Sequence, residues 1–476
     1  MERWSRDQVL ALAPDAASRK AAAGVSAAGK WSGTGALPEA VWGECRGSGA
    51  TPYRTCVDLS EPAYRCSCPS RKFPCKHALG LLLLWSADGM ATAASPPAWA
   101  AEWLDERRDR AAKKAGATAA GAGDTGAGHA TSGPGGDDRA GDSLGGPAGD
   151  DAGGGAPEGG GPEDGGVRGP RPGKGRPAAE QRESRVTSGL SELERWLCDQ
   201  IAQGVAQARQ TGLADWDDLA RRLVDAQAPG VAGVVSRLSR LLREEDWPGL
   251  LLGEYALIHL LAVAHRRTAE LPAELRETVR SRIGFPVTRE SVLASPPVRD
   301  HWDVLGGRDE EQDRLVARRI WLAGRKTGRP AMVLSFAPVG QALDASLVPG
   351  TTIDADLAFY PGASPLRALV AGRHGHVAAG PPPGMPLSQV PARIAEVLAG
   401  DPWADSWPVV LSGVTPSEDA LADGEGAALP LHPSSAPPWR LLAVSGGRPV
   451  TVAAEWTPGG LRPLTTWDEE ERVVPL

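Results

Sequence analysis

The chain has 476 residues, of which 41% are hydrophobic, and this is enough for several packed cores in roughly two to four domains. Its net charge of −8 disfavours non-specific attraction of the whole chain to nucleic acid or to an anionic membrane. The first residues carry charges where a signal peptide would be apolar, and no run reaches the ~18 apolar residues of a membrane helix. We therefore expect a cytoplasmic protein without a membrane partner, in which cysteines are reduced.

The first region, residues 1–116, is expected to open with a helix capped by Ser5. Three short segments, AVWGECR, YRTCVDL and AYRCSC, lie between turn residues and predict strands. The apolar stretch KHALGLLLLWSA follows directly and predicts a helix. A later stretch, WLDERRDRAAKK, is rich in spaced opposite charges and predicts an exposed helix.

Residues 117–177 are rich in Gly, Ala, Asp and Pro, with almost no apolar side chain larger than Ala, which predicts a disordered acidic linker. Charge separates the same regions, since residues 1–114 carry +4, residues 115–183 carry −5 and the remainder carries −7. The third region, 185–476, begins with helical periodicity over 187–285 and continues with short apolar segments over 300–476. It predicts a helical block followed by a mixed or antiparallel sheet.

Three of the six cysteines lie with one histidine in the twelve-residue segment CSCPSRKFPCKH. In a reducing compartment, such a cluster indicates a metal site rather than disulfides. A tetrahedral zinc ion would find a Cys3His donor set in Cys66, Cys68, Cys75 and His77. The alternative is that two or three of these cysteines are buried thiols that bind no metal. Four protein ligands leave no position for water, so we predict one structural Zn²⁺ that does no hydrolytic chemistry.

Basic side chains surround this cluster, namely Arg65, Arg71, Lys72 and Lys76. Three thiolates on Zn²⁺ leave a net charge of −1, which these residues would offset. They would equally meet the phosphates of a nucleic acid or the acidic side chains of a protein partner. Only Phe73 is aromatic nearby, so base stacking has little support from the sequence.

The segment CSCPSRKFPCKHALGLLLL resembles a SWIM zinc finger, whose pattern is C-x-C, a short gap and C-x-H. The resemblance implies a ββα fold with its core at 41–87, and zinc ligands at Cys66, Cys68, Cys75 and His77. The order of finger, Gly-rich linker, LVDAQAPGVAG and AFYPGASPLRALV is similar to bacterial SWIM zinc finger proteins. SWIM fingers elsewhere are taken to bind DNA or proteins. Bacterial members often occur beside MoxR-type AAA ATPases and von Willebrand A-domain proteins, which implies a partner of one of these types.

No P-loop, G-x-S-x-G, H-E-x-x-H or G-x-G-x-x-G motif occurs, so we expect no enzyme. Other candidate ligands are interpreted as core, loop or solvent-facing residues: Cys45, Cys56, Cys198, His374, His376, Asp354 and Asp356. The sequence thus predicts an α+β multidomain chain with a small zinc finger, a linker and a C-terminal α+β domain. The predicted function is a zinc-binding interaction module for protein–protein contacts. The alternatives are DNA binding through the basic finger, and an enzyme with an unrecognised site in residues 185–476.

Overall fold

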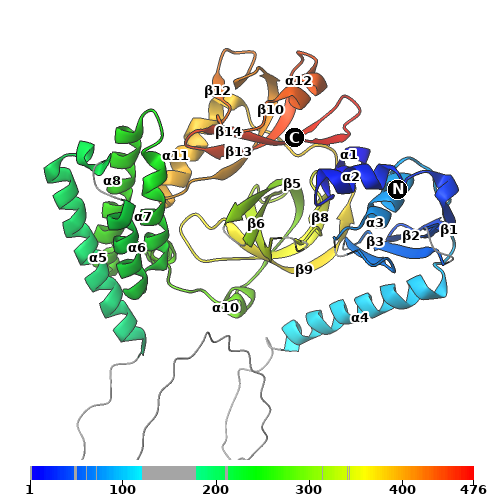
Figure 1. Cartoon of the computed structure of the whole chain (residues 1–476), viewed down its shortest axis with the longest axis horizontal. Coiled ribbons are helices and arrows are strands. Elements are labelled where there is room, and N and C mark those ends of the chain that lie inside the picture. The colour runs from blue at the N-terminus through cyan, green and yellow to red at the C-terminus, as the bar shows by residue number, and fades with distance from the viewer. Residues whose placement is uncertain are drawn as a thin grey trace, which may run out of the picture.

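The computed structural model describes residues 3–47, 51–60, 62–70, 72–120, 178–209, 213–312, 315–339, 341 and 343–476. Along the described chain, an N-terminal domain is followed by a helical block, a barrel and a second sheet (Figure 1). The predicted linker lies outside the described residues from residue 121 onward, and its first four residues continue helix α4 (Ala98–Ala120).

The N-terminal domain is a four-stranded antiparallel sheet with helices on both faces. The strands follow one another in sheet order: β1 (Trp31–Ala36), β2 (Ala40–Cys45), β3 (Tyr53–Asp58) and β4 (Ala63–Cys66). One face packs on α1 (Arg6–Ala11), α2 (Ala16–Ala23) and α3 (Lys76–Ser86), and η1 (Ala28–Lys30) leads into β1. The other face packs on the first turns of α4. The predicted ββα unit is therefore β3, β4 and α3 within a larger domain.

Strand periodicity explains the two covered faces of this sheet. Val41 belongs to the core under α3, whereas its neighbour Trp42 belongs to the core under α4, because successive side chains of a strand point to opposite faces. Helix α3 is apolar on nearly every side, and Leu79, Leu81 and Leu82 are completely buried. This burial holds the first turn of α3, and with it the predicted ligands, against the sheet.

The helical block contains α5 (Ala178–Gln203), η2 (Val205–Arg209), α6 (Leu213–Asp225), α7 (Pro229–Leu241), α8 (Trp247–Arg266), η3 (Thr268–Glu270), α9 (Ala273–Ile283) and α10 (Arg289–Leu293). The helices from α5 to α9 share one apolar core. By length and composition alone, α8 would be able to cross a membrane. In this structure it is a bundle helix, since Leu251, Tyr255 and Ile258 pack in the shared core.

The strand-rich region is divided into a closed barrel and a separate sheet, where the sequence predicts a single sheet. The barrel has the strand order β5-β6-β7-β9-β8, and only β7 and β9 run parallel. Its strands are β5 (Val298–Gln312), β6 (Leu315–Gly324), β7 (Pro330–Pro338), β8 (Thr352–Phe359) and β9 (Arg367–Val377).

The reason for the closure lies in β5. Its first half pairs with β8 and its second half with β6, and an irregularity in the β5–β6 pairing separates Val304 from Gly306. Gly306 has φ +139°, and a Cβ there would stand 2.8 Å from the side chain of Leu464. Glycine therefore permits both the bend of β5 and the close approach of the second sheet.

The second sheet is antiparallel with the order β12-β11-β10-β13-β14-β15. Its strands are β10 (Trp407–Pro416), β11 (Ala420–Ala422), β12 (Ala428–Pro430), β13 (Val450–Thr457), β14 (Gly460–Trp467) and β15 (Val473–Pro475). The short η4 (Leu387–Gln389), α11 (Val390–Gly400) and α12 (Trp439–Ser445) pack against it. Trp321 of the barrel and Trp467 of this sheet lie in the apolar contact between the two bodies.

The N-terminal domain docks on the barrel and the second sheet. Val348, from the β7–β8 connection, belongs to the core of the N-terminal domain. The Ser5 hydroxyl donates to the carbonyl of Val473 at 3.0 Å, and the Gln8 amide donates to the carbonyl of Pro349 at 2.8 Å. The finger is thus part of one continuous body with the barrel (Figure 1).

Candidate metal centre

The predicted zinc ligands lie where β4 leads into α3. Cys66 is the last residue of β4, and Cys68 lies in the turn that follows. Cys75 caps the N-terminus of α3, and its sulfur accepts the N–H of Ala78 at 3.5 Å. His77 is the second residue of that helix. One strand end and one helix start therefore fix the four side chains relative to each other.

The geometry of the four ligand atoms fits a zinc ion. All four lie within 4.8 Å of one another, and Sγ of Cys66 is 3.8 Å from Nδ1 of His77. Tetrahedral zinc, with bonds of ~2.3 Å to sulfur and ~2.0 Å to nitrogen, separates neighbouring ligand atoms by about 3.5–3.8 Å. Cys75 and His77 are 1% and 4% exposed, whereas Cys66 and Cys68 are half-buried. Within the described residues, no other three or more His, Cys, Asp or Glu side chains gather in this way.

The electrostatics of the three thiols also favour a bound cation. A hydrogen bond from the Cys75 thiol, with smaller contributions from His77 and Thr55, lowers the pKa of Cys66 to about 3. The same contact with Cys66, together with burial, raises the pKa of Cys75, and burial raises that of Cys68. Without a cation, only one of the three sulfurs readily becomes a thiolate. A divalent ion would let all three ionise, so the residues fit one Zn²⁺ held by Cys66, Cys68, Cys75 and His77.

Two residues of β3 support the ligands from outside the coordination sphere. The Thr55 hydroxyl is 3.2 Å from Sγ of Cys66, because the two residues are paired across β3 and β4. The Tyr53 ring packs on the His77 ring, with centroids 4.7 Å apart and planes inclined at 31°. These contacts orient one sulfur and the imidazole. Sequence analysis missed both residues, and their position on the strand paired with β4 is the only signal for them.

The predicted contact residues are distributed unevenly around the finger. Arg65, Lys72 and Lys76 are exposed, and Arg71 lies outside the described residues. The Lys72 ammonium is held 2.5 Å from the carboxylate of Asp15, which caps α2. A contact within the chain therefore already engages one of the predicted cations.

A cleft of about 610 Å³ opens beside the metal ligands. Its lining includes Lys72, Lys76 and Arg46, together with the rings of Tyr53 and His77, but Arg65 is not part of it. Arg46 follows β2 and would have been hard to find, since it lies 20 residues before Cys66 in the sequence. The cleft presents basic side chains around a small aromatic surface.

The other cysteines lie away from the candidate metal centre. Cys45 and Cys56 are completely buried on opposite faces of the N-terminal sheet, so they belong to two different cores. Burial raises the pKa of Cys56 to about 12, which is typical of an inert core thiol. Cys198 is exposed on α5.

The histidines of RHGHVAAG belong to strand β9, so their interpretation as a loop is wrong. His374 has an acidic neighbour from the adjacent strand, with Nε2 2.7 Å from the carboxylate of Asp356. Asp354 accepts two hydrogen bonds from Arg299, at 2.9 and 3.0 Å. These pairs form a polar strip on the barrel surface, as alternation in a strand with one solvated face would produce.

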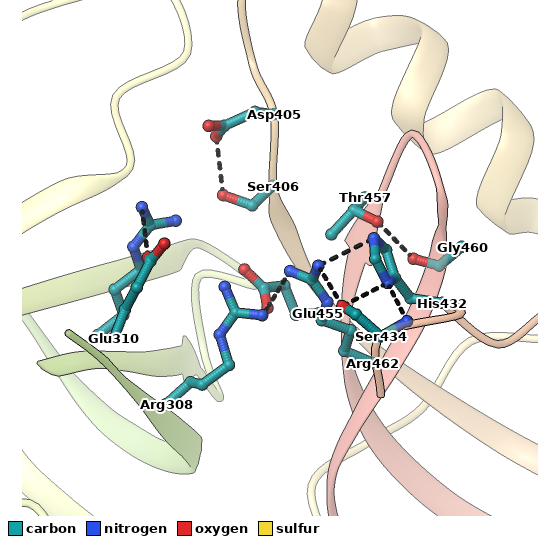
Figure 2. Close-up of polar contacts among 11 residues, drawn as sticks. Arg308, Glu310, Asp405, Ser406, His432, Ser434, Glu455, Thr457, Gly460 and Arg462 are labelled. Atoms are coloured by element: carbon teal, nitrogen blue, oxygen red, sulfur yellow. Dashed lines mark hydrogen bonds and ion pairs between the residues drawn. The ribbon is translucent and has the colours of Figure 1, made fainter. Parts of the chain in front are cut away.

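A second titratable cluster lies between the barrel and the second sheet (Figure 2). Arg308 of β5 and Arg462 of β14 each place a guanidinium nitrogen 3.8 Å from the Glu455 carboxylate. Glu455 is completely buried on β13, and neither of its carboxylate oxygens accepts a hydrogen bond from the part of the chain that the structure describes. Burial raises the pKa of Glu455, although the two arginines act in the opposite direction. The cluster is an ion-pair network that bridges the two bodies.

A serine–histidine contact in this cluster differs from a catalytic triad. The Ser434 hydroxyl is 2.9 Å from Nδ1 of His432. The other ring nitrogen, Nε2, faces the Arg462 guanidinium at 2.9 Å, where a triad would place a carboxylate. Burial, followed by the positive charge of Arg462, lowers the pKa of His432. The imidazole is therefore poorly suited to take up the serine proton.

Comparison with known proteins identifies two segments of the chain. Residues 56–85 match the SWIM zinc finger, and residues 181–283 match the SWIM-associated four-helix bundle domain. The first segment begins within β3 and contains β4, all four candidate ligands and most of α3, and the second ends with α9. No curated protein and no solved structure matches the chain significantly. The chain therefore contains a SWIM zinc finger domain with a Cys3His metal-binding group, followed by a SWIM-associated four-helix bundle domain.

Proposed function

We propose that the finger is a structural zinc module that mediates protein–protein contacts, with an acidic protein segment bound in the cleft beside the metal. The cleft is the observation that carries this proposal. Arg46 and Lys76 line it, both are exposed, and neither has an ion pair among the described residues. An acidic segment would form ion pairs with these two cations, whereas Lys72 already pairs with Asp15.

The form of the cleft favours a protein over a nucleic acid. Among the described residues of the lining, Tyr53 is the only aromatic ring besides the imidazole of His77, and the two rings pack on each other. Stacking of successive bases needs several aromatic faces, and in this lining each of the two rings already covers one face of the other. Four protein ligands also leave the metal no open position for catalysis, which supports a binding role. The resemblance makes a MoxR-type AAA ATPase or a von Willebrand A-domain protein the first partner to test.

The test compares the full-length, zinc-loaded protein with the double variant Arg46→Ala/Lys76→Ala. A matched control, Arg19→Ala/Lys20→Ala, removes the same charge from exposed positions of α2 that do not line the cleft. We expect the cleft variant to lose a partner that the wild type and the control capture, with zinc content unchanged. Binding of single-stranded DNA should be weak in all three. Tight, salt-steep DNA binding that only the cleft variant loses would overturn the proposal in favour of a nucleic-acid finger.

A further inference from the structure

A second cleft, of about 580 Å³, lies at one end of the barrel, far from the finger in sequence. Its walls come from α9, from α10 with the residues on either side of it, from the residue before β7, from the end of β8, and from the β8–β9 loop (residues 360–366). The lining includes the guanidinium of Arg329 and the rings of Phe359 and Tyr360. The family matches and the proposed function do not account for this cleft.

Arg329 is the unusual residue in the lining. It is half-buried, and burial lowers its pKa. Its guanidinium lies 3.7 Å from the ring centroid of Phe359, and among the described residues the side chain of Arg329 has no ion pair and no hydrogen bond. Other partly buried arginines are paired: Arg325 with Asp303 at 2.8 Å, and Arg282 with Asp401 at 2.6 Å. A partly buried cation without a counterion is costly, so an anion supplied from outside would relieve the cost at Arg329.

A planar group would find matching surfaces next to this arginine. The guanidinium lies over the Phe359 ring, and its N–H groups have no hydrogen-bond partner among the described residues. They could therefore bind an oxyanion in the forked geometry that arginine favours. Tyr360 lines the cleft, and Arg367 lies over its ring at 4.3 Å without an acidic partner among the described residues. Aromatic rings and guanidinium planes in succession are surfaces on which bases stack.

The strand order of the barrel is consistent with such a ligand. Counting from β5, the first strand closes on the fourth, and the third runs parallel to the fifth. This is the order of OB barrels, which bind oligonucleotides on the face of strands 2 and 3 and on the loop between strands 4 and 5. Here Trp321 and Met332 place the middle of that face against the second sheet, and Trp321 is completely buried. The β8–β9 loop remains available, and it lines the cleft.

We propose that this cleft binds a nucleotide unit, with its phosphate on Arg329 and its base against Tyr360. The fold alone does not establish this function, because one fold supports many; the uncompensated arginine and the adjacent rings carry it. Glu277 also lines the cleft and has no ion pair among the described residues. Its carboxylate offers an acceptor to the N–H groups of a base and repels further phosphates, so the site suits one unit better than a long strand.

The test titrates the full-length, zinc-loaded protein with adenosine 5′-monophosphate, with adenosine and with a hexathymidylate, and follows binding by calorimetry. We expect the monophosphate to bind and adenosine to bind at least about tenfold more weakly. This is the factor expected for the loss of one charge-assisted pair. Arg329→Met should cause a similar loss, and Arg329→Lys, which keeps the charge without the planar fork, a smaller one. The control Arg289→Met changes an exposed arginine of α10 that is not part of the lining and should bind as the wild type does.

The two nucleotide sources give different results. The end of a single strand is indicated if hexathymidylate binds more tightly than the monophosphate. The logarithm of its affinity should then fall with the logarithm of salt concentration with a slope of about −1.4, as expected for two phosphates. Similar affinity for both indicates a free nucleotide. The proposal would be overturned if both probes fail to bind at millimolar concentration. It would also be overturned if Arg329→Met binds them with the affinity of the wild type. If that variant does not fold, Tyr360→Leu decides in its place, and Lys76→Ala should have no effect because the finger cleft is a separate site.

Discussion

Replacing Thr55 by Val should weaken zinc binding while leaving the fold intact. Thr55 is completely buried on β3, and its hydroxyl is 3.2 Å from Sγ of Cys66. A sulfur bound to zinc is a thiolate and only accepts hydrogen bonds, so the hydroxyl must be the donor in the metal-bound protein. Valine keeps the shape and the strand preference of threonine but cannot donate. The loss of a hydrogen bond to a charged group costs about 1.5–3 kcal/mol, which corresponds to a loss of about 10- to 100-fold in zinc affinity.

The assay is competition for zinc with a chromophoric chelator at fixed pH, alongside urea unfolding of the metal-loaded protein. Thr466→Val is the matched control, because Thr466 is also completely buried on a strand and its hydroxyl donates to the Thr451 carbonyl at 2.8 Å. It should lower the free energy of unfolding by about 1 kcal/mol without changing zinc affinity. If Thr55→Val binds zinc within twofold of the wild type, the hydroxyl does not support the metal-bound sulfur and the reasoning fails.

Three further predictions concern the core and two carboxylates. Leu82→Ala, at a completely buried position of α3, should lower the free energy of unfolding by about 2–5 kcal/mol in urea denaturation, and a loss near zero would contradict the packing described. The hydrogen bond from Lys72, followed by those from Ser18, lowers the pKa of Asp15 to about 2, below its unfolded value of about 3.9. The pair of Asp15 and Lys72 therefore stabilises the fold above that value and loses its effect as pH falls toward 2. The thermal midpoints of Lys72→Met and the wild type should therefore converge below about pH 4, and a constant difference would speak against the pair. The pKa of Glu455 is raised by burial, so its ionisation lowers the stability of the fold as pH rises above the unfolded pKa of about 4.3. The variant Glu455→Gln should therefore gain stability relative to the wild type between pH 4 and 7. A relative loss of stability would show that the attraction of the two arginines outweighs the effect of burial.

The candidate metal centre could be predicted from the sequence because its chemistry is local. The ligands occupy twelve consecutive residues, and their spacing already restricts which atoms can meet. The supporting residues Tyr53 and Thr55 could not be predicted in the same way, because their contacts depend on the register between β3 and β4. The site is thus divided into a part set by spacing and a part set by strand pairing.

The same limit explains the difference in the strand-rich region. Alternating or apolar runs predict that a segment is extended, but they do not say which strand it pairs with. Closure of the barrel depends on the two-sided pairing of β5 and on the φ of +139° at Gly306. The contact of Arg329, just before β7, with Phe359, at the end of β8, likewise joins residues 30 positions apart. Such long-range contacts leave no local signal in the sequence.

The hydrogen bond between Ser5 and Val473 joins residues 468 positions apart. Closing so long a loop early in folding is entropically unfavourable, and contacts of large sequence separation slow folding. The docking of α1 against β15 should therefore form after the finger and the barrel have each acquired their own cores. An unfolding experiment with separate probes on the N-terminal domain and on the barrel should then show the N-terminal domain detaching from the barrel, with loss of its contact with Val348, before the rest of either core is lost. The chain would behave as two cooperative units, and the interface between them would form last and separate first.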